Sequence, residues 1–355
     1  MPIHSPIPTR KKAESSLMSH VAMTVRLCVA VLVLALGLAS CGGSSSELVP
    51  AAEPAKSPPP AQKPEGRVVA VGHKPEGLVA DGRTRLLAVG LTNPDRLALV
   101  DMDSGRVVRR VALSEAPRHL ALAGPGGPVL VPAEKSNELV EVSLPSGRKR
   151  VTRVGRQPHD AASDGRGTVF VGNEGGDSVS LVRAGREVRR VKAPVQPGGA
   201  VTSTDGRLVA AVGVSERALE LYDAGSLRSR GKIDVGVGPT HVAARGRRFF
   251  VVDTRGNALL QVLTGGRLRV HRRINLPGAP YAITFDPPRK RFWVTLTKTN
   301  RVVEMSDRHE LRSFATVRQP NSVAVDPVTG RVFVASRADG TLQSFLPSRL
   351  ADGLR

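Results

Sequence analysis

Short apolar segments separated by polar turns fill the chain from residue 66 onwards. A typical unit begins with the apolar stretch 78–80, turns at Asp81-Gly82, and continues in a second apolar stretch over 86–89. A third stretch with alternating polarity covers 97–100, and a fourth, rich in Arg and Val, follows over 106–110. Apolar runs this short, bounded by turn residues, are typical of β-hairpins. The pattern therefore predicts an all-β chain built from four-stranded units.

The four-stranded unit repeats seven times. Each copy opens with a proline, and consecutive prolines lie 39 to 42 residues apart: Pro75, Pro117, Pro158, Pro197, Pro239, Pro280 and Pro320. Four strands in a repeat of about forty residues are the signature of a propeller blade. The sequence predicts a seven-bladed β-propeller over residues 66–346.

The two ends of the repeat region complement each other. The seventh copy has three strands, ending at 342–345, and is followed only by a polar tail over 347–355. Residues 66–71 precede the first proline and resemble the fourth strand of the other copies, such as 105–108. Because an unpaired sheet edge invites aggregation, we expect the segment 66–71 to complete the last blade and close the ring.

The last copy also carries a family resemblance. The run from Asp326 to Ala335, Asp-Pro-Val-Thr-Gly-Arg-Val-Phe-Val-Ala, resembles the YVTN-type propeller repeat of surface-layer and periplasmic proteins. The resemblance extends over residues 66–346 and implies the propeller fold. It implies no particular activity, since the function of a propeller resides in its site rather than in its fold.

The N-terminal residues have the pattern of an export signal. Arg26 precedes an apolar run of 13 residues, 27–39, which is shorter than the roughly 20 residues that a membrane-spanning helix needs. The run ends in Leu-Ala-Ser-Cys-Gly at 38–42, which resembles the lipobox of bacterial lipoproteins. We expect a signal peptide over 1–40, with the true start at Met18 or Met23, and lipidation at Cys41.

A linker is expected between the lipidated cysteine and the propeller. Residues 42–65 contain six prolines and show no periodicity, which predicts a flexible, partly extended tether over 41–65. The expected location is the extracytoplasmic side of the bacterial envelope, with the chain anchored to a membrane through Cys41.

The composition adds a strong basic bias. The formal net charge is +21, and removal of residues 1–40 takes away four basic residues and one acidic residue, which leaves +18. Many of the remaining arginines fall in the predicted fourth strands, where charge protects exposed sheet edges. The alternative is that these outer strands bind anionic envelope polymers or lipid headgroups. Nucleic acid is not expected as a partner, since the chain contains only 3% aromatic residues for base stacking.

Polar residues gather in two sets of loops that share one end of the channel in a propeller. The loops entering the first strands supply Glu76, His119, His159, Asp160, His241, Tyr281 and Asn321. The loops joining second and third strands supply Glu134, Glu174, Asp253, Arg255 and Arg337. His119, His159 and His241 are the candidate ligands for a divalent metal, or the acid and base of a lyase or hydrolase. In the alternative interpretation these residues only line a wet channel mouth.

No complete catalytic motif supports an enzyme. His-Glu-x-x-His, Gly-x-Ser-x-Gly, a phosphate-binding Gly-Lys-Ser/Thr loop and the haem motif Cys-x-x-Cys-His are all missing from the sequence. The sequence favours a monomeric binding or interaction module that requires no cofactor. A metal-assisted, lactonase-like lyase or hydrolase with its site in the funnel is the competing hypothesis. The identities of ligand and partner remain open.

Overall fold

The computed structural model describes Met1 and residues 48–348. The expected signal peptide, Cys41 and tail residues 349–355 lie outside this range. Among the described residues, no helix combines the length and apolar character needed to cross a membrane.

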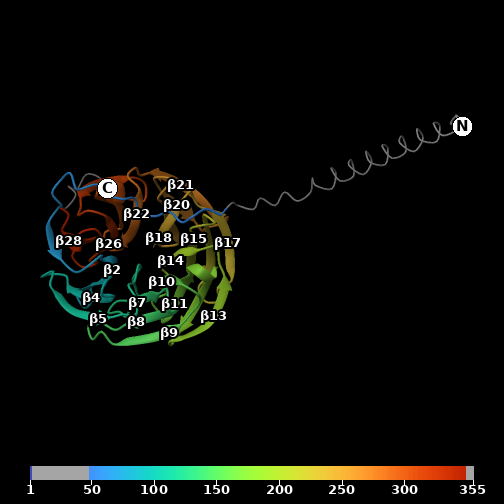
Figure 1. The fold of residues 1–355 in the computed structure, drawn as a ribbon, viewed down its shortest axis with the longest axis horizontal. Coiled ribbons are helices and arrows are strands. Elements are labelled where there is room, and N and C mark those ends of the chain that lie inside the picture. Colours follow the sequence, from blue (N-terminus) through green and yellow to red (C-terminus); the bar gives the residue numbers. More distant parts are fainter. Residues whose placement is uncertain (2–47, 349–355) are drawn as a thin grey trace. The chain divides into compact units, whose positions relative to one another are not determined.

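Seven antiparallel sheets of four strands each are arranged around a central axis (Figure 1). Blade 1 consists of β2 (Glu76–Asp81), β3 (Leu86–Leu91), β4 (Arg96–Asp101) and β5 (Val107–Ala112). Blade 2 consists of β6 (Ala121–Leu122), β7 (Val129–Ala133), β8 (Glu138–Val142) and β9 (Lys149–Arg153). Blade 3 consists of β10 (Pro158–Ser163), β11 (Thr168–Asn173), η1 (Glu174–Gly176), β12 (Ser178–Arg183) and β13 (Arg186–Lys192).

The remaining blades follow in chain order and repeat this layout. Blade 4 consists of β14 (Pro197–Thr202), β15 (Leu208–Gly213), β16 (Ala218–Asp223) and β17 (Ser229–Asp234). Blade 5 consists of β18 (Pro239–Arg245), β19 (Arg248–Asp253), β20 (Ala258–Leu263) and β21 (Arg269–Asn275). Blade 6 consists of β22 (Pro280–Asp286), β23 (Arg291–Leu296), η2 (Thr297–Thr299), β24 (Arg301–Met305) and β25 (Glu310–Ala315).

Blade 7 joins the two ends of the described chain. Its first three strands are β26 (Pro320–Val325), β27 (Val332–Ser336) and β28 (Thr341–Phe345), and its outermost strand is β1 (Arg67–Ala70). β1 pairs antiparallel with β28, from Arg67 opposite Ser344 to Ala70 opposite Thr341. The predicted seven-bladed fold and its closure by the N-terminal strand are confirmed.

Small aliphatic side chains fill the spaces between blades. Leu87 and Val89 of blade 1, for example, pack in one cluster with Phe333 of blade 7, and all three are at most 1% exposed. Burial of such a side chain contributes about 1.5–3 kcal/mol. A core built mainly from Val, Leu and Ala is what the low aromatic content predicts.

The innermost strands share an irregularity that positions the site. In six blades the register between the first and second strands shifts directly after the opening residues, as between Pro158 and Asp160 or between Pro280 and Ile283. A bulge of this kind leaves a residue unpaired and turns side chains in a new direction. Proline is tolerated at the first residue of a strand because that residue need not donate an N–H hydrogen bond to the neighbouring strand. In these six blades the bulge redirects the residues that follow the opening, and Asp160, His241 and Tyr281 line the channel.

Residues 48–65, which we call the strap, lie against the propeller, although the sequence predicts a flexible tether as far as residue 65. The strap belongs to the same compact unit as the blades. Its contacts reach blades 4 to 7: Val49 with Ser215, Ala51 with Arg255, Ala55 with Thr297 and Gln319, Pro58 with Asn300, and Glu65 with Ala315 and Gln343. In these hydrogen bonds, backbone groups of the strap find partners on the propeller. The composition of the strap alone does not predict such contacts.

Candidate functional site

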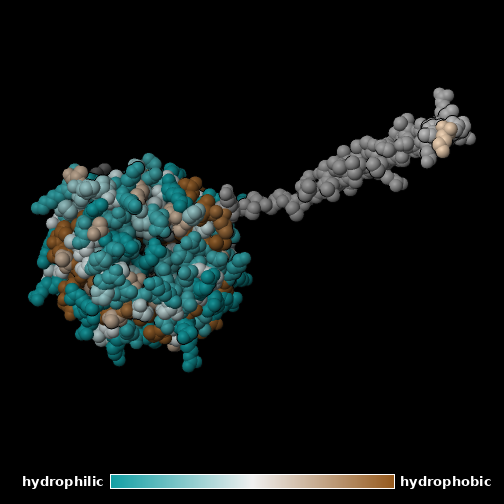
Figure 2. All heavy atoms as spheres, viewed as in Figure 1, coloured by the Kyte–Doolittle hydropathy of each residue, from teal (hydrophilic) through white to brown (hydrophobic). Residues whose placement is uncertain are grey.

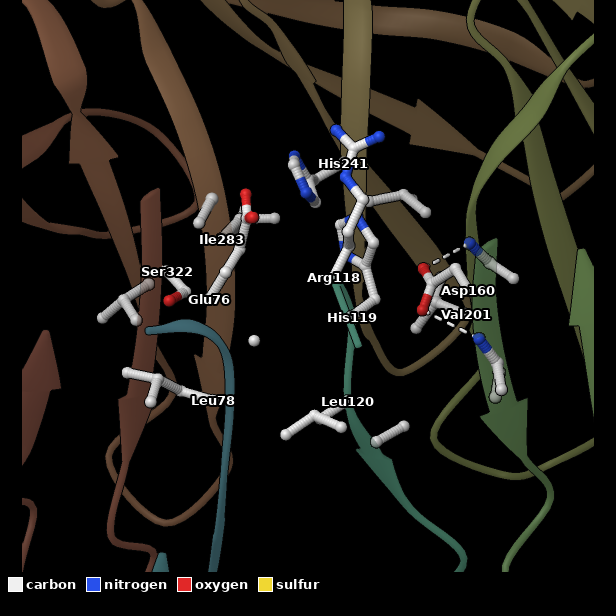
Figure 3. A pocket seen from close by; sticks show the side chains of 18 of the residues that line it. Glu76, Leu78, Arg118, His119, Leu120, Asp160, Val201, His241, Ile283 and Ser322 are labelled. Atoms are coloured by element: carbon white, nitrogen blue, oxygen red, sulfur yellow. Dashed lines mark hydrogen bonds between the residues drawn. The ribbon is translucent and has the colours of Figure 1, made fainter. Parts of the chain in front are cut away.

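A cavity of about 300 Å³ occupies the channel between the innermost strands (Figure 3). The residues at the start of these strands form a polar layer consisting of Glu76, Arg118, His119, Asp160, His241, Tyr281 and Asn321. Further along the strands, apolar side chains form a collar consisting of Leu78, Leu120, Val201, Val242, Ile283 and Val323. Arg118 with Leu120 and Tyr281 with Ile283 show the order of these two zones, since all four line the channel.

The three candidate histidines converge at the polar layer, of which His119 and His241 are members and against which His159 packs. The ring centroids of His119 and His159 are 4.5 Å apart, and those of His119 and His241 are 4.8 Å apart. Tyr281 extends the cluster, with its ring 4.6 Å from that of His241. These residues come from blades 2, 3, 5 and 6, so the cluster exists only when the ring is closed.

A different set of atoms forms the best metal-binding geometry. The ligand atoms of Glu134, His159 and Glu174 all lie within 4.8 Å of one another, and they are the one such group among the described residues. His159 Nδ1 lies 2.8 Å from Glu134 Oε1 and 3.1 Å from Glu174 Oε2. Of the three candidate histidines only His159 belongs to this group, and the ring of His119 packs at a tilt between those of His159 and His241.

Local structure explains how the two carboxylates reach His159. Glu134 directly follows β7, and Glu174 begins the short helix η1 directly after β11. Gln196 Nε2 donates a hydrogen bond of 2.8 Å to Glu174 Oε1 and fixes its orientation. Burial alone would lower the pKa of His159, but hydrogen bonds to Glu134 and Glu174 raise this pKa to about 9. His159 is therefore protonated at neutral pH and donates from Nδ1 to both carboxylates.

The two neighbouring imidazoles are held neutral. Burial, followed by the positive charges of His159 and Arg118, lowers the pKa of His241 to about 3. Burial and the nearby His159 and His241 likewise lower the pKa of His119 well below its ordinary value. The histidine cluster thus contains one charged imidazole, that of His159, and two uncharged ones.

Asp160 and Tyr281 complete the polar layer. Burial raises the pKa of Asp160 to about 6, although its carboxylate accepts hydrogen bonds from the backbone N–H groups of Ala161 (2.8 Å) and Ala200 (2.9 Å). Burial likewise raises the pKa of Tyr281, despite the opposing charge of Arg118. Figure 3 shows Asp160 across the cavity from Glu76, with Arg118 and His119 between them.

The other predicted funnel residues hold the scaffold together. Asp253 is buried and accepts hydrogen bonds from the backbone N–H groups of Val237, Gly238 and Gly256. Arg255 bonds to the strap, 2.9 Å from the carbonyl oxygen of Ala51. Arg337 pairs with Glu76, and Asn321 lies 3.4 Å from the same carboxylate.

The strap covers the end of the channel at which the first strands begin. Ala51, Ala52 and Glu53 line a small space together with His159 and Glu174. Ala52 is only 6% exposed, and Glu53 lies 3.9 Å from the Arg118 guanidinium. A proline-rich stretch without periodicity carries no signal for docking, so the sequence does not predict this covering segment. The residues of the apolar collar look like ordinary strand positions in the sequence, so the collar is not predicted either.

Comparison with known proteins identifies the fold. No protein-family model matches the chain, and no curated protein matches it. The hydrazine synthase of Kuenenia stuttgartiensis is similar in structure, with 16% identity, a TM-score of 0.68, and coverage of 81% of this chain and 99% of that one. A streptogramin B lyase is similar with 12% identity and a TM-score of 0.68 over 78% and 96% of the two chains. A chain of the mitotic checkpoint complex is similar with 15% identity and a TM-score of 0.69 over 85% and 97%.

Identities this low establish a β-propeller fold and no more. This fold commonly serves as a binding or interaction module, and some of its similar structures are enzymes.

Proposed function

We propose that this protein is an exported, lipid-anchored binding protein whose channel holds a small ligand with an apolar body and a hydrogen-bond-donating head. The observation that carries the proposal is the cavity of about 300 Å³, in which a polar layer adjoins an apolar collar. A concave site in which a few polar groups converge beside apolar side chains is the usual form of a small-molecule site. The export pattern around Arg26, Cys41 and the YVTN-like repeats supports placement at the bacterial envelope, outside the cytoplasm.

The collar suits an apolar ligand body. Leu120, Val242 and Ile283 are only partly buried because they border the channel. A ligand that removes such surface from water gains about 25 cal/mol per Å². The cavity lies near the lower end of the usual range of pocket volumes, which suits a ligand of one or two rings.

An unsatisfied acceptor on His241 is the reason why the ligand should carry a hydrogen-bond donor. Its Nδ1 is buried and has no hydrogen-bond partner within residues 48–348. The backbone of Tyr281 hydrogen-bonds the imidazole and favours its protonation, which places the proton of the neutral ring on Nε2. Nδ1 is then an unsatisfied acceptor, and Ser322 Oγ in the cavity lining is also without a partner in this range. Nδ1 is closed to water in the structure, so the ligand hydroxyl reaches it only after a small rotation of the imidazole, and the bond then removes a cost of about 1–3 kcal/mol.

Calorimetric titration with 2-naphthol as a probe tests this function. We expect binding to the purified protein, and weaker binding, by roughly 5- to 100-fold, of 2-methoxynaphthalene, which has the same rings but no donor. His241→Phe should remove the preference for the hydroxyl because it keeps a ring and deletes the acceptor. Val201→Phe should block both probes by filling the cavity.

The matched control places the same bulk outside the channel. Val188→Phe changes an exposed position of the outer strand β13 and should leave both affinities unchanged. Equal affinity for the two naphthalene probes, or binding that survives Val201→Phe, would refute the channel as the ligand site.

A second candidate function is metal-assisted lyase or hydrolase chemistry. The observation that favours it is the convergence of Glu134, His159 and Glu174. A histidine with two carboxylates suits a divalent cation, and a streptogramin B lyase is among the similar structures. Elemental analysis after incubation with Mn²⁺ or Zn²⁺ separates the candidates. One equivalent of metal in the wild type that is lost in Glu134→Gln/Glu174→Gln would support metal chemistry. An equal metal content in the wild type and the variant would rule out this second function.

A further inference from the structure

The outer surface of the propeller has an uneven distribution of charge. The outermost strands of blades 1 to 5 are β5, β9, β13, β17 and β21, and we call them the basic belt. Together they contain fourteen Arg and Lys residues and only two acidic residues, Glu187 and Asp234. The outermost strands of blades 6 and 7, β25 and β1, contain two basic residues and one acidic residue.

The charges of the belt are available to a partner. All fourteen basic residues are exposed, and hydrophilic residues dominate the face of the ring seen in Figure 2 and extend to its rim. Only three of the fourteen form ion pairs among the described residues: Arg150 with Glu141, Arg190 with Glu187, and Lys232 with Glu216. Residues such as Arg109, Arg189 and Arg272 add to an unbalanced positive field.

Protection of sheet edges does not account for this distribution. A charge of either sign on an exposed edge discourages pairing between molecules, yet the belt is almost wholly basic. β1 is also an exposed edge, and its only charged residue is Arg67. A large field of one sign is instead a device for attracting a partner of opposite charge.

The geometry points to a flexible linear polyanion, such as a phosphate polymer, that wraps around the rim of blades 1 to 5. The belt follows the outer edge of five consecutive blades and so curves around more than half of the ring (Figure 1). A flat lipid surface could touch the edges of only one or two blades at a time. A flexible chain of phosphates can follow the curve and meet basic residues on every blade. This surface is separate from the channel, so the inference is independent of the proposed function.

Titration of the full-length protein with long-chain inorganic polyphosphate over roughly 50 to 200 mM salt tests the inference. Three variants each remove two unpaired belt charges: Arg109→Gln/Arg110→Gln on blade 1, Arg189→Gln/Lys192→Gln on blade 3, and Arg269→Gln/Arg272→Gln on blade 5. Each contact to a flexible polyanion contributes about 0.7 to the slope of log affinity against log salt. We expect each variant to lower the magnitude of that slope by about 1.4 and to weaken binding several-fold at the low-salt end.

The control removes the same charge elsewhere. Lys290 and Arg308 are exposed on turns of blade 6, and Lys290→Gln/Arg308→Gln should leave the slope unchanged. Phosphatidylglycerol vesicles serve as the flat anionic surface. The proposal of a wrapping polyanion would be overturned if only one belt variant changed the slope, or if the control variant changed it equally. Tighter binding to the vesicles than to polyphosphate would also overturn it.

Discussion

Acidification from pH 7 to pH 5 removes about 4 kcal/mol of stability through His119 and His241, about 2 kcal/mol for each, of which the raised pKa values of Asp160 and His159 return about 2 kcal/mol. Both imidazoles remain neutral in the folded protein because burial lowers their pKa, to about 3 in the case of His241. In the unfolded chain each takes up a proton near its ordinary pKa of about 6.5. A lowered folded pKa gives stability that is present above pH 6.5 and is lost as the pH falls. Denaturant unfolding at a series of pH values measures the effect.

Two variants make this measurement specific to the polar layer. His119→Gln/His241→Gln should abolish the loss, so that stability no longer falls between pH 7 and pH 5. His271→Gln should retain the full slope, because His271 is exposed on β21. A wild-type profile that is already flat would mean that the folded channel accepts protons, which contradicts two neutral imidazoles.

Replacing both carboxylates around His159 has the second largest expected effect. Glu134→Gln/Glu174→Gln removes the hydrogen-bonding partners that raise the pKa of His159 to about 9. A raised folded pKa gives stability that is complete below pH 6.5 and is lost as the pH rises through 9. The variant should therefore be less stable by roughly 2–3 kcal/mol at pH 7. The wild-type advantage should shrink towards pH 9.

Observation of His159 by NMR, with unfolding curves at pH 7 and pH 9, checks this result. The control Glu65→Gln/Glu310→Gln removes the same charge from two exposed positions and should keep the wild-type dependence on pH. A stability loss that is equal at pH 7 and pH 9 would show that the two glutamates act through packing and not through the charge of His159.

The fold could be predicted from the sequence because the repeat encodes it seven times. The prolines from Pro75 to Pro320 mark the start of each inner strand, and the missing last strand identifies 66–71 as its replacement. The structure confirms this with the pairing of β1 and β28. Local turn chemistry and the burial of apolar faces are sufficient for such a prediction.

The site could be predicted only as a set of positions. The loops that enter the first strands place His119, His159 and His241 in the funnel. His119 and His241 lie two residues after their prolines and His159 only one, so the spacing does not predict that they converge. His159 and His241 lie at bulges of their strand entries, and His119 lies in the loop before β6. Spacing along the sequence encodes neither arrangement. The pairing of His159 with Glu134 and Glu174 joins three loop or strand ends from two blades, and no local pattern reports such a contact.

The strap could not be predicted because its docking depends on complementary backbone groups. Residues 48–65 are rich in proline and lack periodic apolar positions, which is the composition of a flexible linker. Their partners, such as Ser215, Thr297 and Gln319, lie in loops more than 160 residues away. Only the closed ring presents these groups together at one end of the channel.

A crystal structure of the protein with 2-naphthol tests the central claim most directly. The proposed function predicts one probe molecule in the channel, with its hydroxyl within hydrogen-bonding distance of His241 Nδ1 and its rings against Leu120 and Ile283. A probe bound only outside the channel, or rings in the collar with the hydroxyl directed away from His241, would contradict it.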